Sequence, residues 1–266
     1  KKKDIFSFPA YTKNIKVKEI RHLQGRSKNR REMGKFVVEG VRLIEEAVKV
    51  GWTPTSVLYS EELSERGFEL VRQIQSLEAD VEVAEPHVLQ YASDTKNPQG
   101  IIAVIPMKEA EPTDDIDFVL VTDQIRDPGN LGTLLRTASA AGVQAVFIPP
   151  GTADVFSPKV LRSAMGAHFK ISIQQGDYSE LAAICKTHHL SLHVAEVSGG
   201  TIYHQTDLSK PLALVIGGEA NGVSPEILAL EPSPIHIPMP GKSESLNAAI
   251  AGAVLLFEVA RQRASQ

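Results

Sequence analysis

Residues 118–148 read FVLVTDQIRDPGNLGTLLRTASAAGVQAVFI. The segment begins with a continuous apolar run at 118–122 and ends with a second at 145–148, which is typical of strands buried on both faces. Between the two runs, residues 127–142 have the pattern of a loop followed by a helix. Its apolar stripe is formed by Leu131, Leu134, Leu135 and Ala138. The order strand, helix, strand predicts a βαβ unit and therefore a parallel sheet.

The rest of the chain extends this α/β pattern in both directions. Further apolar strands are expected at 171–173, 190–195 and 212–216, so the second half should form a largely parallel sheet covered by helices. In the first half, we expect strands at 36–38, 56–59, 81–84 and 101–105, with helices at 40–50 and 61–77. The stretch 107–117 is acidic and has no periodicity. We therefore predict a basic tail at 1–15, a small α/β domain at 16–106, a linker at 107–117 and a second domain at 118–266.

Composition excludes several classes of protein. The chain has 266 residues, of which 42% are hydrophobic and 23% charged, an ordinary globular balance. Its single cysteine, Cys185, cannot close an internal disulfide, and no Cys and His cluster has zinc-binding spacing. The most apolar stretch, 248–260, is too short to span a bilayer and contains Glu258. We expect a cytoplasmic protein with no membrane segment and no metal.

The basic residues are concentrated at one end of the chain. The first 35 residues contain twelve Lys or Arg and three Asp or Glu, whereas the remainder contains 16 and 29. Such a segment can attract phosphate groups, and it can equally be a solvated lysine-rich tail. Charge alone leaves both interpretations open.

The loop and helix at 127–142 offer two candidate site residues. Asn130 is placed as an N-cap and Gly142 as the C-terminal stop, while Arg136 falls off the apolar stripe and can point beyond the carboxyl ends of the strands. A purely structural explanation, in which Asn130 only caps the helix and Arg136 only lies on its solvated face, is more common than a role in a site. The turn reads DPGNLG rather than G-x-G-x-x-G, and the second strand ends in prolines instead of an acid, which disfavours a nicotinamide enzyme.

Two later segments also carry candidate residues. LVIGGEANGVSPEIL, residues 214–228, runs from an apolar strand into Gly217, Gly218 and Glu219, where backbone can approach a ligand closely. A tight turn followed by a helix capped at Ser224 explains the same residues. In the third segment, Ser245, Leu246 and Asn247 stand at the start of a helix rich in small residues, where they can orient a polar ligand or merely cap the helix.

Taken in order, these segments resemble the three motifs of the SpoU (TrmH-like) branch of the SPOUT methyltransferases. The matching stretches are NLGTLLRTASAAGV, GGEANGVSPEIL and IPMPGKSESLNAAIAGAVLLFE. FVVEGVRLIEEAV and NPQGIIAVI, in the N-terminal unit, resemble the family's ribosomal-protein-like substrate-binding domain. Nearly the whole chain is covered.

The resemblance implies a fold, a cofactor and a set of site residues. The C-terminal domain should contain a deep trefoil knot, an exception to the usual absence of knots, and should form a homodimer. S-adenosylmethionine is expected at the knot loops, on Gly217, Gly218, Glu219, Ile237, Met239, Gly241 and Leu246. The residues matching the catalytic and substrate-positioning set are Asn130, Arg136, Glu219, Ser245 and Asn247.

The implied activity is S-adenosylmethionine-dependent methylation of a ribose 2′-hydroxyl in RNA. Ribosomal RNA is preferred as the substrate because the two-domain layout is similar to that of the ribosomal members. Since a guanidinium stays protonated, we interpret Arg136 as holding RNA phosphate and stabilising the developing alkoxide, so its replacement by alanine should abolish methylation. A transfer RNA methyltransferase, a catalytically silent RNA-binding protein and an α/β enzyme acting on small molecules are the alternatives.

Overall fold

The computed structural model describes residues 14–108, 115–219, 222–241 and 243–265. Residues 1–13 of the predicted basic tail and 109–114 of the predicted linker lie outside these ranges. The chain divides into two compact units. The first comprises the chain up to Lys108 together with Phe156–Leu161, and the second comprises the remainder.

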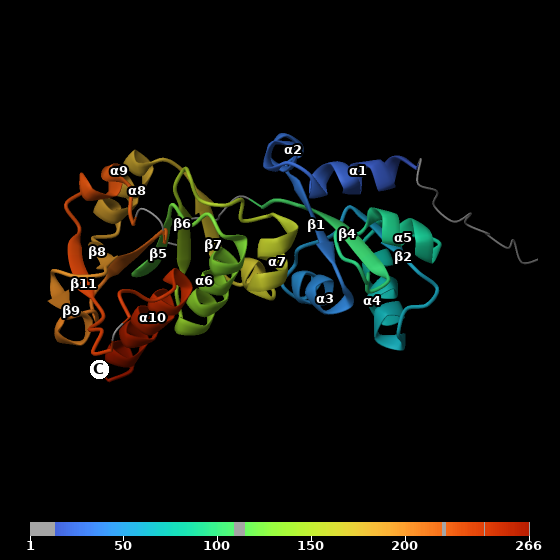
Figure 1. Ribbon diagram of the computed structural model, residues 1–266. Helices are drawn as coiled ribbons and strands as arrows, with labels where there is room; N and C mark the ends of the chain where they lie inside the picture. Colours follow the sequence, from blue (N-terminus) through green and yellow to red (C-terminus); the bar gives the residue numbers. More distant parts are fainter. Residues whose placement is uncertain (1–13, 109–114, 220–221, 242, 266) are drawn as a thin grey trace, which may run out of the picture. The chain divides into compact units, whose positions relative to one another are not determined.

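The first unit is a four-stranded sheet with helices on both faces. Its strand order is β1-β4-β2-β3, with only β2 and β3 parallel. The strands are β1 (Lys35–Glu39), β2 (Ser56–Tyr59), β3 (Asp80–Val83) and β4 (Ile101–Pro106). Helices α1 (Ile15–Gln24) and α5 (Pro86–Ala92) share one core with the sheet, and α2 (Ser27–Met33) follows α1. Figure 1 shows α3 (Val41–Lys49) and α4 (Glu65–Gln75) on the opposite face.

The second unit is built on a seven-stranded sheet in which every pairing is parallel. Its strand order is β7-β6-β5-β10-β8-β11-β9. The strands are β5 (Phe118–Asp123), β6 (Ala145–Ile148), β7 (Ser172–Gln175), β8 (Ser191–Glu196), β9 (Thr201–Ile202), β10 (Leu212–Gly217) and β11 (Ser233–His236). All six residues of β5 are buried, as the apolar run predicted. The expected α/β fold with a largely parallel sheet is confirmed.

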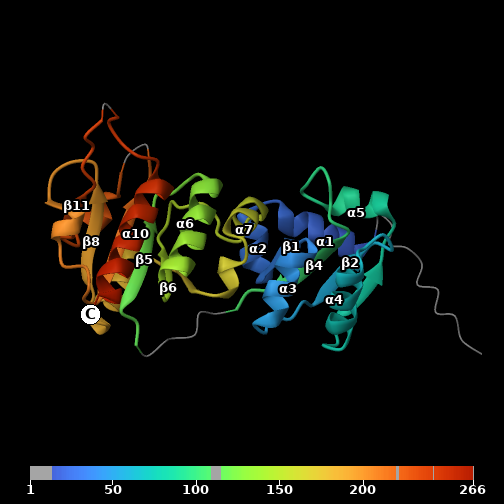
Figure 2. The same ribbon diagram turned by 90° about the horizontal axis from the view of Figure 1, so that it is seen from below.

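Helices cover both faces of this sheet. Helices α8 (Tyr178–Thr187) and α9 (Pro225–Leu228) pack on one face, where Leu181 and Ile227 join the core. On the other face, α6 (Pro128–Ala141) and α10 (Ala248–Ala264) lie side by side (Figures 1 and 2). The remaining short elements are η1 (Ala167–Phe169), η2 (Tyr203–Gln205) and α7 (Pro158–Ala164), of which the residues up to Leu161 belong to the first unit.

The packing of α10 on α6 depends on a glycine. A Cβ added to Gly252 would lie 2.4 Å from Cδ2 of Leu134 on α6. Gly252 therefore allows the two helices to approach closely. No helix in the described ranges is both long and apolar enough to cross a membrane.

The strand order reverses direction beside β5. The chain runs outward from β5 through β6 to β7, and it then returns to build β8, β10 and β11 on the other side of β5. In open α/β sheets, ligands bind at the carboxyl ends of the strands next to such a reversal. The fold alone therefore directs attention to the loops that follow β5, β10, β8 and β11.

Candidate functional site

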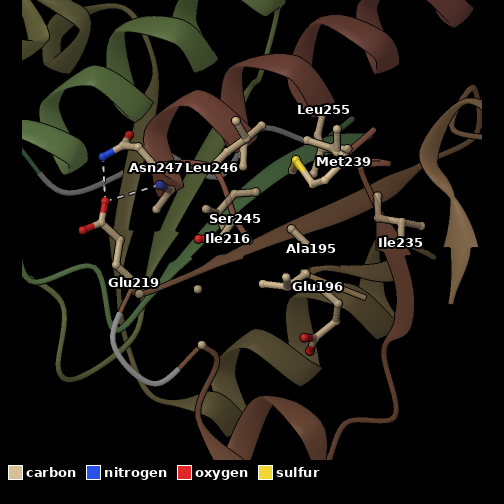
Figure 3. Close-up of a pocket in the computed structure, with 17 residues that line it drawn as sticks. Ala195, Glu196, Ile216, Glu219, Ile235, Met239, Ser245, Leu246, Asn247 and Leu255 are labelled. Atoms are coloured by element: carbon tan, nitrogen blue, oxygen red, sulfur yellow. Dashed lines mark hydrogen bonds between the residues drawn. The ribbon is translucent and has the colours of Figure 1, made fainter. Parts of the chain in front are cut away.

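A cavity of about 550 Å³ lies at the carboxyl ends of β8, β10 and β11. Its walls combine strand ends, the loop that follows β11 and the first turns of α10 (Figure 3). The lining residues are Ala195, Glu196, Val197, Ile216, Gly217, Gly218, Glu219, Gly222, Ile235, Ile237, Met239, Ser245, Leu246, Asn247, Ala248, Ala251 and Leu255. The cavity therefore combines apolar side chains with polar groups, among them the backbone of the glycine-rich loop, as ligand sites commonly do.

The glycine-rich loop after β10 is closed on itself by backbone hydrogen bonds. The N–H of Gly218 donates to the carbonyl of Gly222, and the N–H of Gly222 donates to the carbonyl of Gly218, both at 3.0 Å. A Cβ on Gly217 would lie 2.7 Å from the carbonyl carbon of Gly222. A Cβ on Gly218 would lie 2.3 Å from the carbonyl oxygen of Gln124. Here the glycines allow the loop to pack against protein backbone, in addition to lining the cavity.

Residues from all three motif segments meet at the edge of the cavity. Oε1 of Glu219 accepts hydrogen bonds from Nδ2 of Asn130 at 2.8 Å and from Nδ2 of Asn247 at 2.6 Å. The same oxygen accepts a longer bond of 3.4 Å from the N–H of Ala248. Nδ2 of Asn247 also lies 3.1 Å from Oδ1 of Asn130, so the three side chains form one network. Figure 3 shows Glu219 and Asn247 joined by a hydrogen bond at one side of the cavity.

Two helix caps set up this network. Asp127, and not Asn130 as expected, is the N-cap of α6, since its side chain accepts a 2.8 Å hydrogen bond from the N–H of Asn130. The side chain of Asn130 is thereby left to reach Glu219. Asn247 does cap α10, because its Oδ1 accepts from the N–H groups of Ala249 and Ile250, while its Nδ2 serves the network.

A second, smaller cavity lies on the other side of Glu219. It has a volume of about 170 Å³ and is lined by Gln124, Ile125, Arg126, Asp127, Asn130, Gly218, Glu219 and Ala248. Three of these residues, Gly218, Glu219 and Ala248, also line the larger cavity. The two cavities therefore share a wall that contains the Glu219 carboxylate. Among the described residues that line either cavity, Arg126 is the only Lys or Arg.

The loop that carries Arg126 has an unusual backbone. Gln124 has φ of 56°, in the left-handed region that residues other than glycine rarely adopt. Its Nε2 donates to the carbonyl of Pro150 at 3.1 Å, and its Oε1 accepts from Arg126 at 3.2 Å. Strained backbone of this kind concentrates at functional sites, where the surrounding structure holds it in place.

The buried carboxylate of Asp123 connects the loop that follows β5 with the glycine-rich loop that follows β10. Asp123, at the end of β5, is fully buried. Its Oδ2 accepts from the N–H of Ser224 at 2.5 Å, and its Oδ1 accepts from the hydroxyl of Tyr178 at 2.9 Å. Burial raises the pKa of Tyr178, and the hydrogen bond to Asp123 raises it further. Ser224 also caps α9, as predicted, because its hydroxyl accepts from the N–H of Ile227.

The residues predicted from the sequence fall into three groups. The larger cavity is lined by most of them, namely Gly217, Gly218, Glu219, Ile237, Met239, Ser245, Leu246 and Asn247. Asn130 lines the smaller cavity and joins the network. Gly241 lines neither cavity. Arg136 is exposed on α6, also lines neither cavity, and has no hydrogen bond or ion pair within the described residues.

Sequence reasoning did not identify Asp123, Arg126 or Glu196. Glu196 is the last residue of β8 and lines the larger cavity from the strand end. The available signal was a polar residue at or shortly after the end of a strand, since Asp123 and Glu196 are the last residues of β5 and β8 and Arg126 lies three residues beyond β5. Within the described ranges, no group of three or more His, Cys, Asp or Glu side chains could hold a metal ion.

Comparison with known proteins gives matches over nearly the whole chain. Residues 117–257 match the model of the SpoU rRNA Methylase family, and residues 14–103 match the MRM3-like substrate binding domain. The chain is 33% identical over 249 residues to the 23S rRNA (guanosine(2553)-2′-O)-methyltransferase RlmP of Bacillus subtilis, covering 93% of this chain and 96% of that protein.

Solved structures give the same picture. The SpoU methyltransferase AviRb from Streptomyces viridochromogenes, in complex with AdoMet, is 29% identical, with a TM-score of 0.88 and coverage of 95% of this chain and 99% of that chain. The TrmH/SpoU tRNA modifying enzyme of A. aeolicus is 27% identical, with a TM-score of 0.50. The match covers only 59% of this chain and 79% of the chain of that enzyme.

Proposed function

Because the chain belongs to the SpoU rRNA methylase family, we propose that it methylates a ribose 2′-hydroxyl of ribosomal RNA with S-adenosylmethionine as the methyl donor. The observation that carries the proposal is the network of Asn130, Glu219 and Asn247, which joins residues from three distant segments at the wall between two cavities. A two-substrate transfer needs two adjoining sites, since donor and acceptor must meet at one point, and the two cavities share Gly218, Glu219 and Ala248.

The residues around the larger cavity fit S-adenosylmethionine. Ile216, Ile237 and Leu255 give it apolar walls, and the carboxylate of Glu196 at its edge can accept hydrogen bonds from ribose hydroxyls. We therefore assign the cofactor to Gly217, Gly218, Glu219, Ile237, Met239 and Leu246. Gly241 also belongs to the set implied by the family resemblance. Bound there, S-adenosylmethionine supplies a methyl group on a sulfonium, which an oxygen nucleophile can take by in-line displacement.

The smaller cavity is the proposed site of the acceptor ribose. It shares Glu219 with the larger cavity, and Arg126 provides a permanent positive charge for an adjoining phosphate of the RNA. Asn130 is positioned by Asp127 and by Glu219, so its amide can orient the ribose. Ser245 and Asn247 stand on the cofactor side of the same wall.

Glu219 is the proposed acceptor of the hydroxyl proton. All three hydrogen bonds to its carboxylate are made to Oε1, and within the described residues Oε2 accepts none. The network thus fixes the carboxylate through one oxygen and leaves the other to accept a proton from the ribose hydroxyl. Arg136 retains the role of holding RNA phosphate and stabilising the alkoxide.

The exposed position of Arg136 is consistent with a homodimer in which it reaches the partner's site. Helix α10 presents two large apolar side chains to solvent, Ile250 at 51% and Phe257 at 52% exposure, next to α6. We propose that these two helices form the dimer interface. We also propose the trefoil knot implied by the family resemblance. The chain passes from β11, near one edge of the sheet, to α10, which packs against α6 and β10. Cytoplasmic location remains a prediction.

Ribosomal RNA is preferred over transfer RNA because of the first unit. The relative named as acting on 23S rRNA matches over both units, whereas the tRNA modifying enzyme covers only 59% of this chain. The direct test is to incubate the protein with labelled S-adenosylmethionine and unmodified ribosomal or transfer RNA, and then to identify the labelled nucleoside. A 2′-O-methylated nucleoside from ribosomal RNA alone is expected. Label found only in transfer RNA would overturn the assignment of ribosomal RNA as the substrate. Binding of RNA without methyl transfer would favour a catalytically silent RNA-binding protein.

A further inference from the structure

The two helical layers of the first unit differ in charge. Helices α1 and α2, on one side of the sheet, contain six Lys or Arg and two Glu within their bounds. Helices α3 and α4, on the opposite side, contain four Lys or Arg and four Glu (Figure 1). The basic character noticed in the first 35 residues is therefore not confined to the tail, because much of it is displayed on a folded surface.

Two of the cations in this layer have structural roles. Lys16 forms ion pairs of 2.6 Å with Asp80 and 2.9 Å with Glu82, which join α1 to β3. Arg30 is buried and donates to the carbonyls of Leu23 and Gly25, which stabilises the turn between α1 and α2. These two residues belong to the fold and are not available to a partner.

Four other cations are exposed and have no acidic partner. They are Lys18 and Arg21 on α1, Arg26 in the turn, and Arg31 on α2, which together we call the basic face. Within the described residues, none of their charged groups makes a hydrogen bond or an ion pair. Exposed cations without partners keep their full attraction for the phosphates of a nucleic acid.

An aromatic side chain adjoins one of these cations. The guanidinium of Arg21 lies over the ring of Tyr91, with its carbon 5.4 Å from the ring centroid. Tyr91 is on α5 and is 51% exposed although it is a large aromatic residue. Arginine planes and aromatic rings are the groups on which proteins stack unpaired RNA bases. This pair therefore adds a contact for a base to a surface that binds phosphates.

We infer that the basic face and Tyr91 form a docking surface for the RNA substrate, with phosphates on Lys18, Arg21, Arg26 and Arg31 and an unstacked base on Tyr91. The inference rests on the proposed function, because it takes RNA as the substrate. An anionic membrane would also attract the cations, but a helix that binds membranes needs an apolar face to insert. In α1 that face is used by the core, where Val17, Ile20 and Leu23 are at most 1% exposed.

The test is a fourfold variant with a matched control. Replacing Lys18, Arg21, Arg26 and Arg31 by Gln removes four charges from the basic face. Its control replaces the four cations of α3 and α4 by Gln, namely Arg42, Lys49, Arg66 and Arg72, which gives the same change in net charge. Two of the control residues, Lys49 and Arg66, pair with Glu45 at the surface, where such pairs contribute little to stability.

Binding of the full chain to an unmodified large-subunit ribosomal RNA transcript is measured over a range of salt concentrations. For the fourfold variant, the slope of log K against log salt should fall by about 3, since each lost phosphate contact removes roughly 0.7 to 0.9. The control should retain the wild-type slope. Binding of S-adenosylmethionine, measured by calorimetry, reports whether the cofactor site of each variant is folded.

Tyr91 provides an independent measurement. Tyr91→Ala should weaken RNA binding by about 5- to 150-fold, the range for loss of one stacked base, whereas Tyr91→Phe should bind as wild type. Equal salt slopes for the fourfold variant and its control would overturn the inference while leaving methyl transfer intact. Binding of the basic face to vesicles of phosphatidylglycerol in place of RNA would also overturn it. A wild-type protein that neither binds nor methylates ribosomal RNA would instead refute the proposed function.

Discussion

Gly218→Ala tests how the cofactor cavity is built. The added Cβ would lie 2.3 Å from the carbonyl oxygen of Gln124, whereas real Cβ atoms stay at least 3.0 Å from such neighbours, so the loop or the carbonyl must move by about 0.7 Å. Gln124 cannot move easily, because its left-handed backbone is held by side-chain bonds to Pro150 and Arg126. The φ of Gly218 is not in the left-handed region, so the effect of alanine there is steric.

Overpacking of this kind typically destabilises by about 1–3 kcal/mol. Because Gly218 lines the cavity, we expect that strain to be relieved by displacement of the loop, which lowers affinity for S-adenosylmethionine by about 5- to 150-fold. Gly241→Ala is the matched comparison: the family resemblance includes Gly241 in the cofactor set, but a Cβ there meets nothing within 4 Å and the residue lines neither cavity, so the structure predicts no steric effect. Its affinity should stay within a factor of about two in calorimetric titrations. Wild-type affinity in Gly218→Ala, or an equal loss in Gly241→Ala, would refute the reasoning.

The remaining predictions concern the acceptor side of the site and the response of stability to pH. Glu219→Gln keeps the shape of the side chain but removes its basicity, so kcat should fall by about 100-fold or more while S-adenosylmethionine still binds; a wild-type kcat would exclude Glu219 as the proton acceptor. Arg126→Ala should raise KM for RNA by about tenfold or more through loss of a charged phosphate contact, with cofactor affinity unchanged, and an unaltered KM would contradict that role. Arg136→Ala should be inactive alone. If Arg136 acts across a homodimer, mixing this variant with Glu219→Gln should restore transfer, because each mixed dimer then has one site with both native residues. An inactive mixture argues against action across the dimer. Burial lowers the pKa of His168 from 6.5 to about 4, so as the pH falls the imidazole is protonated in the unfolded chain before it is protonated in the folded protein. The contribution of neutral His168 to the free energy of unfolding is therefore full above pH 6.5 and is lost as the pH falls toward 4. Between about pH 7.5 and about pH 5 this group should remove about 2 kcal/mol from the free energy of unfolding, a loss that His168→Gln should abolish in denaturant titrations; equal losses in both proteins would contradict it.

The strands were predictable because their signal is local. The apolar runs at 118–122 and 145–148 became β5 and β6 almost residue for residue, since a strand buried on both faces needs a continuous apolar sequence. The start of α6 was misjudged by three residues. Asp127 followed by a proline is an N-cap signature of its own, and it competed with Asn130 for the same helix.

The site itself was only partly predictable. The sequence marked Asn130, Glu219 and Asn247 as candidates, but it could not show that they share hydrogen bonds, because they are 28 to 117 positions apart. Their meeting depends on β10 lying between β5 and β8, an order that no local pattern contains. Arg136 illustrates the converse, since its place in a motif did not bring it to either cavity.

The register between β10 and β5 is what turns this strand order into a site. Gly217 pairs with Asp123 at the last position of both strands, so the glycine loop and the Gln124 loop leave the sheet at the same level. Asp123 then holds the far end of the glycine loop through the N–H of Ser224, and the Gln124 carbonyl faces Gly218 at its near end. A slip of one residue would direct Glu219 to the opposite face of the sheet and separate it from Asn130. The end of β5 therefore determines the position of the carboxylate, although Asp123 lines neither cavity.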